Sequence, residues 1–390
     1  MKRSIQLFAA AAVLSLGCNS LVVAQNDAVR GIYESSANIA TNMDGVHGFA
    51  APPASFDPLT ASDEALATYG FPPHPDKSAE PAAYAQWAHA VTTAKKRWNG
   101  TLRARPFHNT PMKTAKSPAG FSAPSGSNTP SVGNSYNWSG AVNTNTVTKY
   151  GLSSVYYVFS EFNVPVAQQA FNGSGGTICD GGWDITAIWN GIDGFSGAGG
   201  GDVLQGGVDS AYYCAGSTKG PFYSSWIEWF PAGSIYEFGV NPGDDIYVET
   251  WSTSSTQGYV YIADLTTQIS ATYGLTAPSG TQLVGNSAEF IVERPCCRGS
   301  NLYPLANYVG NFWSYSGDYN FRHVLSFPGS TAPTTWLLGM LDDAGDQVIS
   351  VPNGVTNWDL KQGLTPAGLG GKYSIFFQDQ NCAHDGGCTP

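Results

Sequence analysis

The chain has 390 residues and a net charge of −11, with 42% hydrophobic, 13% aromatic and only 12% charged residues. This length fits one large domain with a leader, or two domains. So many aromatic side chains need a core, which excludes a disordered chain. Residues 120–390 carry seven Lys or Arg against twenty-one Asp or Glu, and such an acidic region opposes binding to nucleic acid or to an anionic membrane, since both depend on Lys and Arg.

Residues 1–24 have the pattern of an export signal. "MKRS" supplies the positive start, "IQLFAAAAVLSLG" the short apolar centre, and "VVAQ" the small residues that surround cleavage after Ala24. The apolar run is short for a membrane anchor. "SLGC", which ends at Cys18, is a loose match to a lipoprotein signal and stays open as an alternative. We expect a secreted, extracellular protein that is not held at a membrane once the signal is removed.

Residues 25–130 form a leader that resembles a propeptide. The Ser and acidic residues of "SDEALATYG" (62–70) are typical of a helix start, and the helical spacing of Tyr84, Trp87 and Val91 predicts a second helix over 78–100. A linker rich in Gly, Ser and Pro follows from about 116 to 135. The slightly basic leader complements the acidic domain that it would cover; a permanent N-terminal extension is the alternative.

Residues 131–390 are predicted to form one all-β catalytic domain. Short runs of aromatic and β-branched residues, bounded by Gly, Pro, Asp or Ser, indicate strands. Many strands without helices between them indicate an antiparallel sandwich or barrel. The predicted strands lie within 153–165, 186–194, 224–231, 244–252, 258–273, 288–295 and 335–343.

Removal of the signal would leave an even number of cysteines, which favours disulfides in an exported chain. The sequence does not choose among the possible pairings, although the last two cysteines would close a small loop. A zinc site is the competing interpretation, but no C-x-x-C pair and no nearby His cluster supports it. The six cysteines are Cys179, Cys214, Cys296, Cys297, Cys382 and Cys388.

Alternation along the predicted strands places acidic residues and tryptophans on common faces, because alternate side chains of a strand share a face. An aromatic-lined cleft with carboxyls at its floor has this composition, and so does an ordinary solvated sheet face, which stays open as the alternative. The acidic residues are Glu293 in 288–293, Glu228 beside Trp226 in 224–231, and Asp193 beside Trp189 in 186–194.

The residues available for catalysis are carboxyls and amides. No histidine lies between 131 and 295, which disfavours a Ser-His-Asp or Cys-His arrangement and a histidine-ligated metal. A Glu can act as general base on water, and a Gln amide can donate to the oxyanion of a tetrahedral intermediate. Gln205 and Glu293 are therefore a sufficient pair for hydrolysing an amide without a metal or other cofactor. Crowding of Asp209 with other acidic residues, Glu289 among them, would raise carboxyl pKa values and predicts an acidic optimum.

Seven motifs in order resemble the glutamic peptidase (eqolisin) family: "NWSGAV" (137–142), "FNVP" (162–165), "WNGIDG" (189–194), "LQGGVD" (204–209), "SWIEWFP" (225–231), "PGDDI" (242–246) and "AEFIVE" (288–293). The resemblance extends over roughly 130 to 380 and the leader. It implies an antiparallel β-sandwich of the concanavalin A-like type, secretion as a precursor, action in acid, and no metal. It also implies a catalytic pair at Gln205 and Glu293. Residues that line or support the cleft would be Trp138, Trp189, Asp193, Asp209, Trp226 and Glu228.

Three positions depart from the family's pattern. Gly206 stands where members often have Thr, Asn190 replaces an apolar residue, and Ser224 stands in place of an acidic one. These departures concern specificity and pH optimum, and they leave the positions of the catalytic pair unchanged.

The predicted function is that of a secreted, acid-acting endopeptidase whose partner is a protein or peptide substrate and which acts as a monomer. Two other functions suit the same sandwich. In a glycoside hydrolase, Glu228 and Glu293 would be the two carboxyls. In a lectin-like module without activity, Trp189 and Trp226 would bind glycans.

Overall fold

A computed structural model gives the fold of the chain. Three predicted features lie outside the residues that it describes: the signal at 1–24, the part of the linker before 131, and the last two cysteines. The described residues are 29–78, 80–113, 131–144, 155–169, 179, 181–195, 201–308, 312–321, 334–341, 347–349, 359–360 and 369–378.

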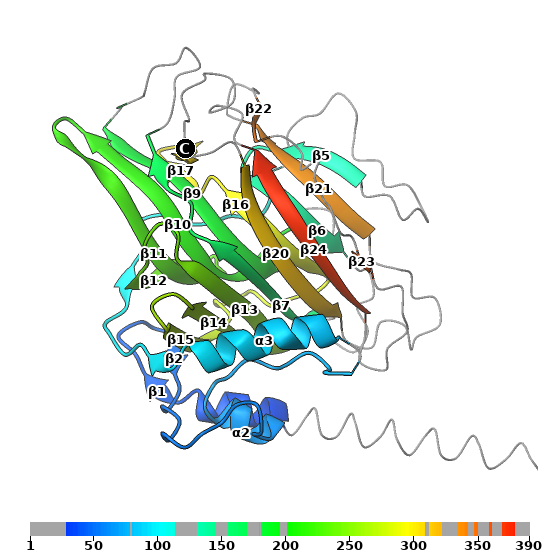
Figure 1. Ribbon diagram of the computed structural model, residues 1–390. Helices are drawn as coiled ribbons and strands as arrows, with labels where there is room; N and C mark the ends of the chain where they lie inside the picture. The colour runs from blue at the N-terminus through cyan, green and yellow to red at the C-terminus, as the bar shows by residue number, and fades with distance from the viewer. Residues whose placement is uncertain are drawn as a thin grey trace, which may run out of the picture.

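Two ten-stranded sheets, named sheet A and sheet B here, pack face to face (Figure 1). In spatial order, sheet A consists of β1 (Ile39–Ala40), β2 (Val46–Gly48), β15 (Ile269–Thr276), β14 (Gln257–Asp264), β13 (Asp245–Ser254), β7 (Val155–Asn163), β20 (Phe312–Phe321), β24 (Leu369–Gln378) and β23 (Asp359–Leu360), with β3 (Lys96–Arg97) also on β15. Apart from the parallel pair β3–β15, its neighbours are antiparallel.

Sheet B carries the predicted catalytic strands. Its order is β22 (Gln347–Ile349), β21 (Thr334–Leu341), β6 (Trp138–Thr144), β16 (Ser287–Glu293), β9 (Gly182–Ile192), β10 (Val203–Ala215), β11 (Thr218–Phe230), β12 (Ile235–Gly239) and β4 (Arg103–Ala104), with β5 (Ser131–Ser135) parallel to β21. Two small pairs complete the described strands: β17 (Cys296–Arg298) with β18 (Asn301–Leu302), and β8 (Ala167–Gln168) with β19 (Asn307–Tyr308). The prediction of an all-β antiparallel sandwich with a partly helical leader is confirmed.

The inner faces of the two sheets form the main core. Ala288, Phe290 and Val292 of β16 are fully buried in it, whereas Ile291 belongs to a separate cluster on the outer face of sheet B. The alternation predicted for this strand is therefore confirmed. Since full burial of one such side chain contributes roughly 1.5–3 kcal/mol, a slip of one residue would move this set to the wrong face.

The two predicted helices of the leader are present, but the second is shorter than predicted. In α2 (Asp63–Thr68), the Ser62 side chain accepts a hydrogen bond from the Ala65 N–H at 3.3 Å, as expected of a helix start. The other helix, α3, covers only Pro81–Thr93. The prediction of a helix to 100 was wrong because the backbone after Thr93 pairs with β15, where the Trp98 N–H donates to the Ser270 carbonyl at 2.7 Å.

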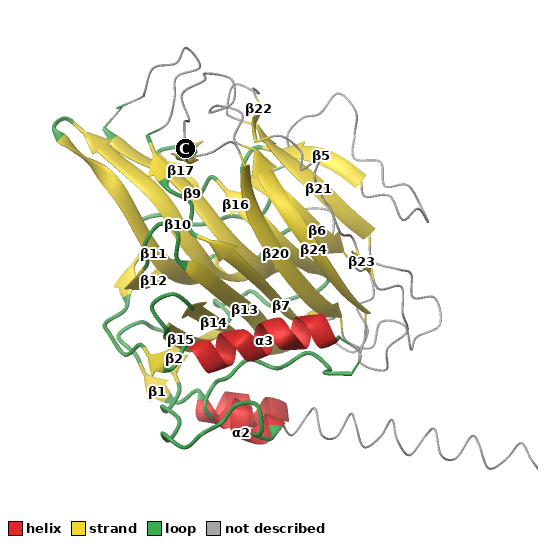
Figure 2. Cartoon of the chain, viewed as in Figure 1, coloured by secondary structure: helices red, strands yellow, loops and turns green. Residues whose placement is uncertain are grey.

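The leader is built into both sheets. Its strands β1, β2 and β3 lie at one edge of sheet A, and β4 lies at the edge of sheet B. Its helix α3 lies across the outer face of sheet A, with α2 beyond it (Figures 1 and 2). The leader and the predicted catalytic domain therefore share sheets rather than forming two separate bodies.

The remaining local differences concern the linker and the cysteines. Residues 131–135, predicted as the end of the linker, are strand β5. Cys179 is bonded to Cys214, and the neighbours Cys296 and Cys297 are bonded to each other.

Candidate active site

The predicted catalytic residues lie on three strands of the outer face of sheet B. The strand order is β16–β9–β10–β11, so β9 separates the strand of Glu293 from the strand of Gln205. Gln205 is directly opposite Gly191 on β9 and Glu228 on β11. Glu293 is opposite Ala187. All of these positions have the same parity, so the side chains of Gln205, Glu228 and Glu293 share one face.

Glycines beside Gln205 let tryptophan side chains approach the sheet. A Cβ atom at Gly207 would lie 2.7 Å from the Cβ of Trp189 and 2.0 Å from the Ile188 carbonyl oxygen. One at Gly191 would lie 3.0 Å from the Cβ of Gln205. The glycine-rich sequence around Gln205 therefore reflects close packing over the sheet.

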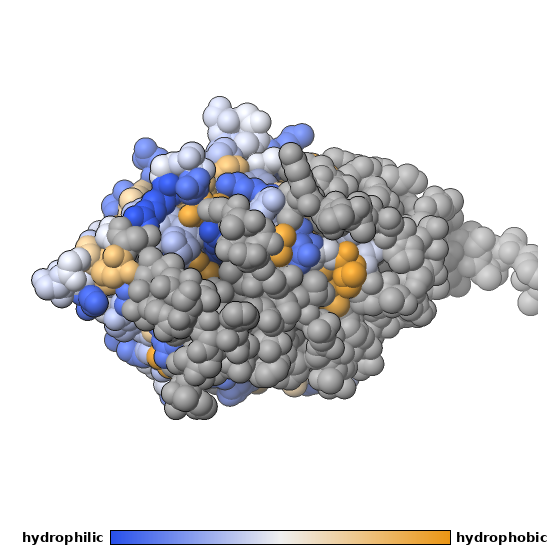
Figure 3. Space-filling model, turned by 90° about the horizontal axis from the view of Figure 1, so that it is seen from above, coloured by the Kyte–Doolittle hydropathy of each residue, from blue (hydrophilic) through white to orange (hydrophobic). Residues whose placement is uncertain are grey.

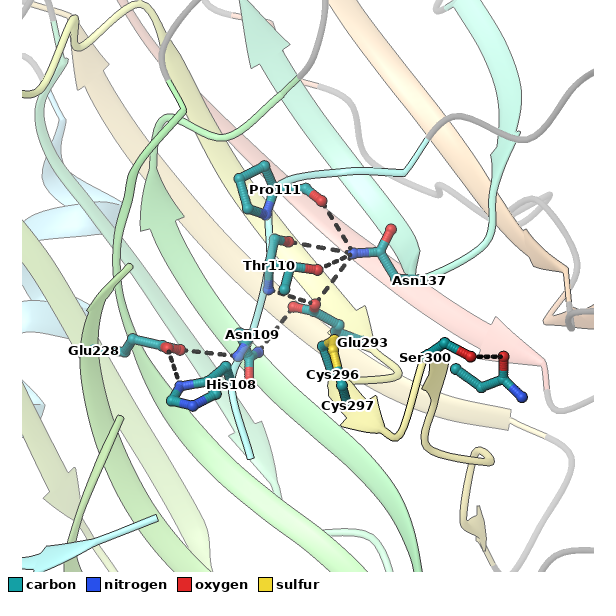
Figure 4. The surroundings of a disulfide bond; sticks show 11 residues. His108, Asn109, Thr110, Pro111, Asn137, Glu228, Glu293, Cys296, Cys297 and Ser300 are labelled. Carbon is teal, nitrogen blue, oxygen red and sulfur yellow. Dashed lines mark hydrogen bonds and ion pairs between the residues drawn. A yellow bond between two sulfur atoms is a disulfide. The ribbon is translucent and has the colours of Figure 1, made fainter. Parts of the chain in front are cut away.

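The Glu293 carboxylate is fully buried and accepts four hydrogen bonds, of which those from Asn109, Thr110 and Asn137 are drawn in Figure 4. One oxygen accepts from Trp189 Nε1 at 3.0 Å and from Asn109 Nδ2 at 2.8 Å. The other accepts from Asn137 Nδ2 at 3.2 Å and from the Thr110 backbone N–H at 3.0 Å. Two of the four donors belong to the leader.

Gln205 is joined to the same network through Glu228. Gln205 Nε2 donates to Glu228 Oε2 at 3.1 Å, and the Asn109 N–H donates to the same oxygen at 3.0 Å. Among the contacts of the described residues, no direct hydrogen bond joins Gln205 to Glu293. Asn109 bridges them, because its backbone reaches Glu228 and its side chain reaches Glu293.

Asp209 and Trp226 hold an arginine of the leader. The Arg105 guanidinium makes two hydrogen bonds to the Asp209 carboxylate, at 2.7 and 2.8 Å, and its carbon lies 4.5 Å from the centre of the Trp226 ring. The Tyr236 hydroxyl also donates to Asp209, at 2.8 Å. Both charged side chains are fully buried, so each needs the other.

Trp138 lies beside Trp189 in the cluster. Their ring centres are 5.0 Å apart in an edge-to-face arrangement, and Trp138 Nε1 donates to the Thr110 carbonyl at 3.0 Å. Of the residues predicted to line the cleft, Trp138, Trp189, Asp209, Trp226 and Glu228 thus all contact the leader or Glu293.

Asp193 does not join this cluster. Strand β9 ends at Ile192, and Asp193 has a φ of 71°, so the alternation that relates it to Trp189 stops there. Its carboxylate accepts hydrogen bonds from the backbone N–H groups of Val284, Gly285 and Asn286. It fixes that turn.

The leader segment 103–113, called the strap, was missed as part of the site. Its alternate residues Arg105, Phe107 and Asn109 are buried and point toward sheet B, whereas Pro106 and His108 between them are exposed. This alternation is only a weak signal in the sequence, because the buried set contains Arg and Asn as well as Phe. Asn137 was also missed, although it precedes Trp138 in the first motif of the domain.

Burial controls the titration of the carboxyls in the site. It raises the pKa of Glu293 to about 8, although the Thr110 N–H opposes the shift and the nearby Glu228 adds to it. Burial likewise raises the pKa of Glu228, against the opposing hydrogen bond from His108. Ionising two interacting carboxyls of this kind together is unfavourable, which suits exchange of a proton with a substrate.

The described ranges contain neither a metal-ion cluster nor a membrane-spanning helix. No group of three or more His, Cys, Asp or Glu side chains there is arranged to hold a metal ion. In that same part of the chain, no helix combines the length and the apolar character needed to cross a bilayer.

Residues 136–314 match the model of the Peptidase A4 family. Aspergillopepsin-2 from Aspergillus niger is 32% identical over 172 residues, which cover 41% of this chain and 56% of that protein. The chain thus spans about half the length of this curated relative.

Two solved structures are similar to the chain at lower identity. A scytalido-glutamic peptidase with a peptide-based transition state analogue is 20% identical, covers 63% of this chain and 98% of its own, and has a TM-score of 0.42. An aspergilloglutamic peptidase from Aspergillus niger is 22% identical, covers 50% and 99%, and has a TM-score of 0.32.

Proposed function

Because residues 136–314 match the model of the Peptidase A4 family, we propose that the chain is a glutamic peptidase of this family. It would be a secreted endopeptidase that hydrolyses peptide bonds in acid, with Gln205 and Glu293 as its catalytic pair. The observation that carries the proposal is the environment of Glu293. Its buried carboxylate is fixed by Trp189 and Asn137, and a peptide segment of the chain itself lies across it.

In the proposed reaction, the Glu293 carboxylate takes a proton from water while the water oxygen attacks the carbonyl carbon of the substrate. The carbonyl oxygen becomes an oxyanion, to which the Gln205 amide donates. Glu293 then returns its proton to the leaving nitrogen, and the C–N bond breaks. Glu228 accepts from one N–H of Gln205, which fixes the amide so that its second N–H is available to the substrate oxygen.

Action in acid follows from the crowding of carboxyls. Burial raises the pKa of both Glu228 and Glu293, so ionising the two together is unfavourable. Under the strap, burial holds the pKa of Glu293 at about 8, so its carboxylate forms in acid only after the strap leaves and water reaches the site, while Glu228 keeps its proton. Trp138, Trp189 and Trp226 would line the groove for a substrate, and Asp209 and Glu228 would supply its polar contacts.

Export is supported by the N-terminal pattern and by two disulfides among the described cysteines, since disulfides persist in oxidising compartments. We assign the protein to the extracellular space on this basis.

The test is cleavage of a denatured protein between pH 2 and 7, after removal of the leader segment that covers the site. Glu293→Gln should lower the rate by about 10²–10⁴-fold and Gln205→Ala by about 10²–10³-fold. Circular dichroism should show an unchanged fold, and Glu64→Gln on α2 should be as active as the natural sequence. Full activity in either site variant, or release of reducing sugar without peptide cleavage, would reject the proposal.

A further inference from the structure

The leader covers both outer faces of the sandwich, and the two interfaces differ in kind. Residues 29–98, called the cover, lie on sheet A, and the strap lies on sheet B. We propose that the cover is a permanent part of the folded enzyme and that only the strap, an autoinhibitory segment, must leave for activity. The strap half of this inference rests on the proposed function.

The strap fills the positions that a substrate and its water would need. All four hydrogen bonds to Glu293 are in place, and Asn109 and Thr110 supply two of them. The carboxylate therefore has no room to activate water. Asn109 also donates to Glu228, so one residue of the strap engages the carboxyls on either side of Gln205.

The strap is held by a chain of polar contacts that ends on Asp209. Arg105 pairs with Asp209, and its NH1 group donates to the Asn109 side-chain oxygen at 2.7 Å. This contact orients the Asn109 amide so that its nitrogen faces Glu293. The backbone contributes as well, since Arg105 N–H donates to the Ser234 carbonyl at 2.9 Å and the strap residue His108 pairs with Cys296 in both directions at 2.7 Å.

The cover is held mainly by apolar packing. Ala83, Ala90 and Ala94 of the α3 region and Tyr33 pack in one buried cluster with an aromatic surface of sheet A. Tyr33 alone contacts two of these rings, with ring centres 5.5 Å from Trp251 and 5.4 Å from Tyr259. The aromatic surface consists of Tyr157, Phe159, Tyr247, Trp251, Tyr259 and Tyr261, all of them at most 1% exposed.

Removal of the cover would leave this aromatic surface in water. Exposed apolar patches of more than a few hundred Å² are rare on soluble monomers, and six neighbouring aromatic side chains form such a patch, because each buries roughly 150–250 Å². With the cover in place, the large apolar side chains exposed in the described ranges are Ile39, Leu59, Val132 and Val166. In the view of Figure 3, apolar residues likewise form small separate groups outside the grey atoms.

The cover also extends sheet A and supplies hydrogen-bond partners to its polar side chains. Strand β2 extends the sheet by antiparallel pairing with β15. The buried Glu80 accepts from the Tyr157 hydroxyl at 3.2 Å, and Gln86 donates to Glu161 at 2.8 Å. Loss of the cover would open an edge strand and remove these two hydrogen bonds.

Two cleavage sites test the inference. Recognition sequences for two different sequence-specific proteases are placed in the exposed stretch 99–101 and between Lys113 and Ser131. A cut on the C-terminal side alone leaves the strap tethered to the bound cover at high effective concentration, so activity should stay close to that of the uncut chain. Cuts on both sides should release the strap and raise peptide hydrolysis by at least about tenfold, while the cover fragment co-elutes with the sandwich in gel filtration.

A second readout does not depend on activity. A synthetic peptide of residues 103–113 should bind the doubly cut protein, as measured by calorimetry. Arg105→Ala in this peptide should weaken binding by about a hundredfold or more, because Asp209 would remain buried without its partner. Arg103→Ala is the matched control, since Arg103 is exposed, and should change binding by less than about threefold.

Each part of the inference has its own contradicting result. If the uncut chain is as active as the doubly cut chain, the strap is not inhibitory. If the cover fragment elutes separately from a folded, active sandwich, the cover is not a permanent part of the enzyme. Failure of the proposed function is distinct from both: the peptide binds with the expected dependence on Arg105, but the doubly cut protein hydrolyses no peptide at any pH.

Discussion

The outer faces of the two sheets bind parts of the same leader by different physical means. On sheet A, aromatic rings and small alanine side chains exclude water over a wide surface. On sheet B, charged and amide groups of the strap meet buried carboxyls at Asp209, Glu228 and Glu293. The first interface is mainly apolar, with a few hydrogen bonds such as that from Tyr157 to Glu80, whereas the second depends on paired charges and hydrogen bonds. The difference teaches that one leader can combine a durable contact with a releasable one.

The largest expected effect is that of pH, which acts on buried carboxyls at and beside sheet B, among them Asp193 after β9 and Glu237 on β12. Burial raises the pKa of Asp193 from 3.8 to about 7, with the Gly285 N–H opposing it, and that of Glu237 from 4.5 to about 8. The folded state therefore keeps protons that the unfolded chain has lost. The stability of the folded state relative to the unfolded chain is therefore greatest below about pH 4, and part of it is lost as the pH rises from about 4 to 7–8.

The melting temperature of the uncut chain between pH 3 and 9 measures this effect. It should be highest at about pH 4 and fall between pH 4 and 8, by an amount that reflects about 1.4 kcal/mol for each unit of pKa shift, before levelling off. Asp193→Asn should flatten the part of the profile below pH 7. A melting temperature that rises steadily from pH 4 to pH 8 would contradict the assignment of these carboxyls as protonated in the folded state.

A large-to-small change in the aromatic surface tests the cover interface. Trp251 is fully buried and stacks on Tyr259 with ring centres 5.4 Å apart. Trp251→Ala should lower the free energy of unfolding by about 4 kcal/mol, through lost burial and a cavity. Urea unfolding measures it, with Leu59→Ala, at an exposed position, as a control within about 0.5 kcal/mol. A loss below about 1 kcal/mol for Trp251→Ala would mean that the cover packs loosely.

Removal of one charge tests the strap interface, again through the free energy of unfolding. Asp209→Asn leaves the buried Arg105 guanidinium without its carboxylate, so the uncut chain should lose about 3 kcal/mol of unfolding free energy. After the strap is cut out on both sides, the same substitution should cost much less, since no guanidinium is then buried against it. Equal losses in the two forms would show that Asp209 stabilises the sandwich by itself.

The sequence was informative where strand alternation holds. The motif that ends on Glu293 predicted that Phe290 and its alternate neighbours face the core and that the Glu293 carboxyl lies on the opposite face of the sheet. The prediction holds because burial of one face fixes the register of β16. The same rule failed at Asp193, where a positive φ follows the end of β9 and turns the side chain into a loop. Parity carries information only as long as the backbone stays extended.

The strap could not be placed from sequence because its partners are distant. Arg105 and Asp209 are separated by 104 positions, and Asn109 and Glu293 by 184. The leader also has a second, stronger pattern, the helical spacing around Trp87, which drew the interpretation toward helices. The end of that helix was misplaced for a related reason: pairing with β15 competes with helix propensity after Thr93, and only the tertiary fold decides between them.

The central claim is that Gln205 and Glu293 act as one catalytic unit, and a double-mutant cycle on the doubly cut protein tests it directly. The quantity is kcat/KM for a peptide in acid, measured for Gln205→Ala, Glu293→Gln and the two together. Residues that serve one step are strongly non-additive, so the double variant should be about as slow as Glu293→Gln alone. Losses that multiply, or a Glu293→Gln protein within about tenfold of the natural sequence, would contradict the claim.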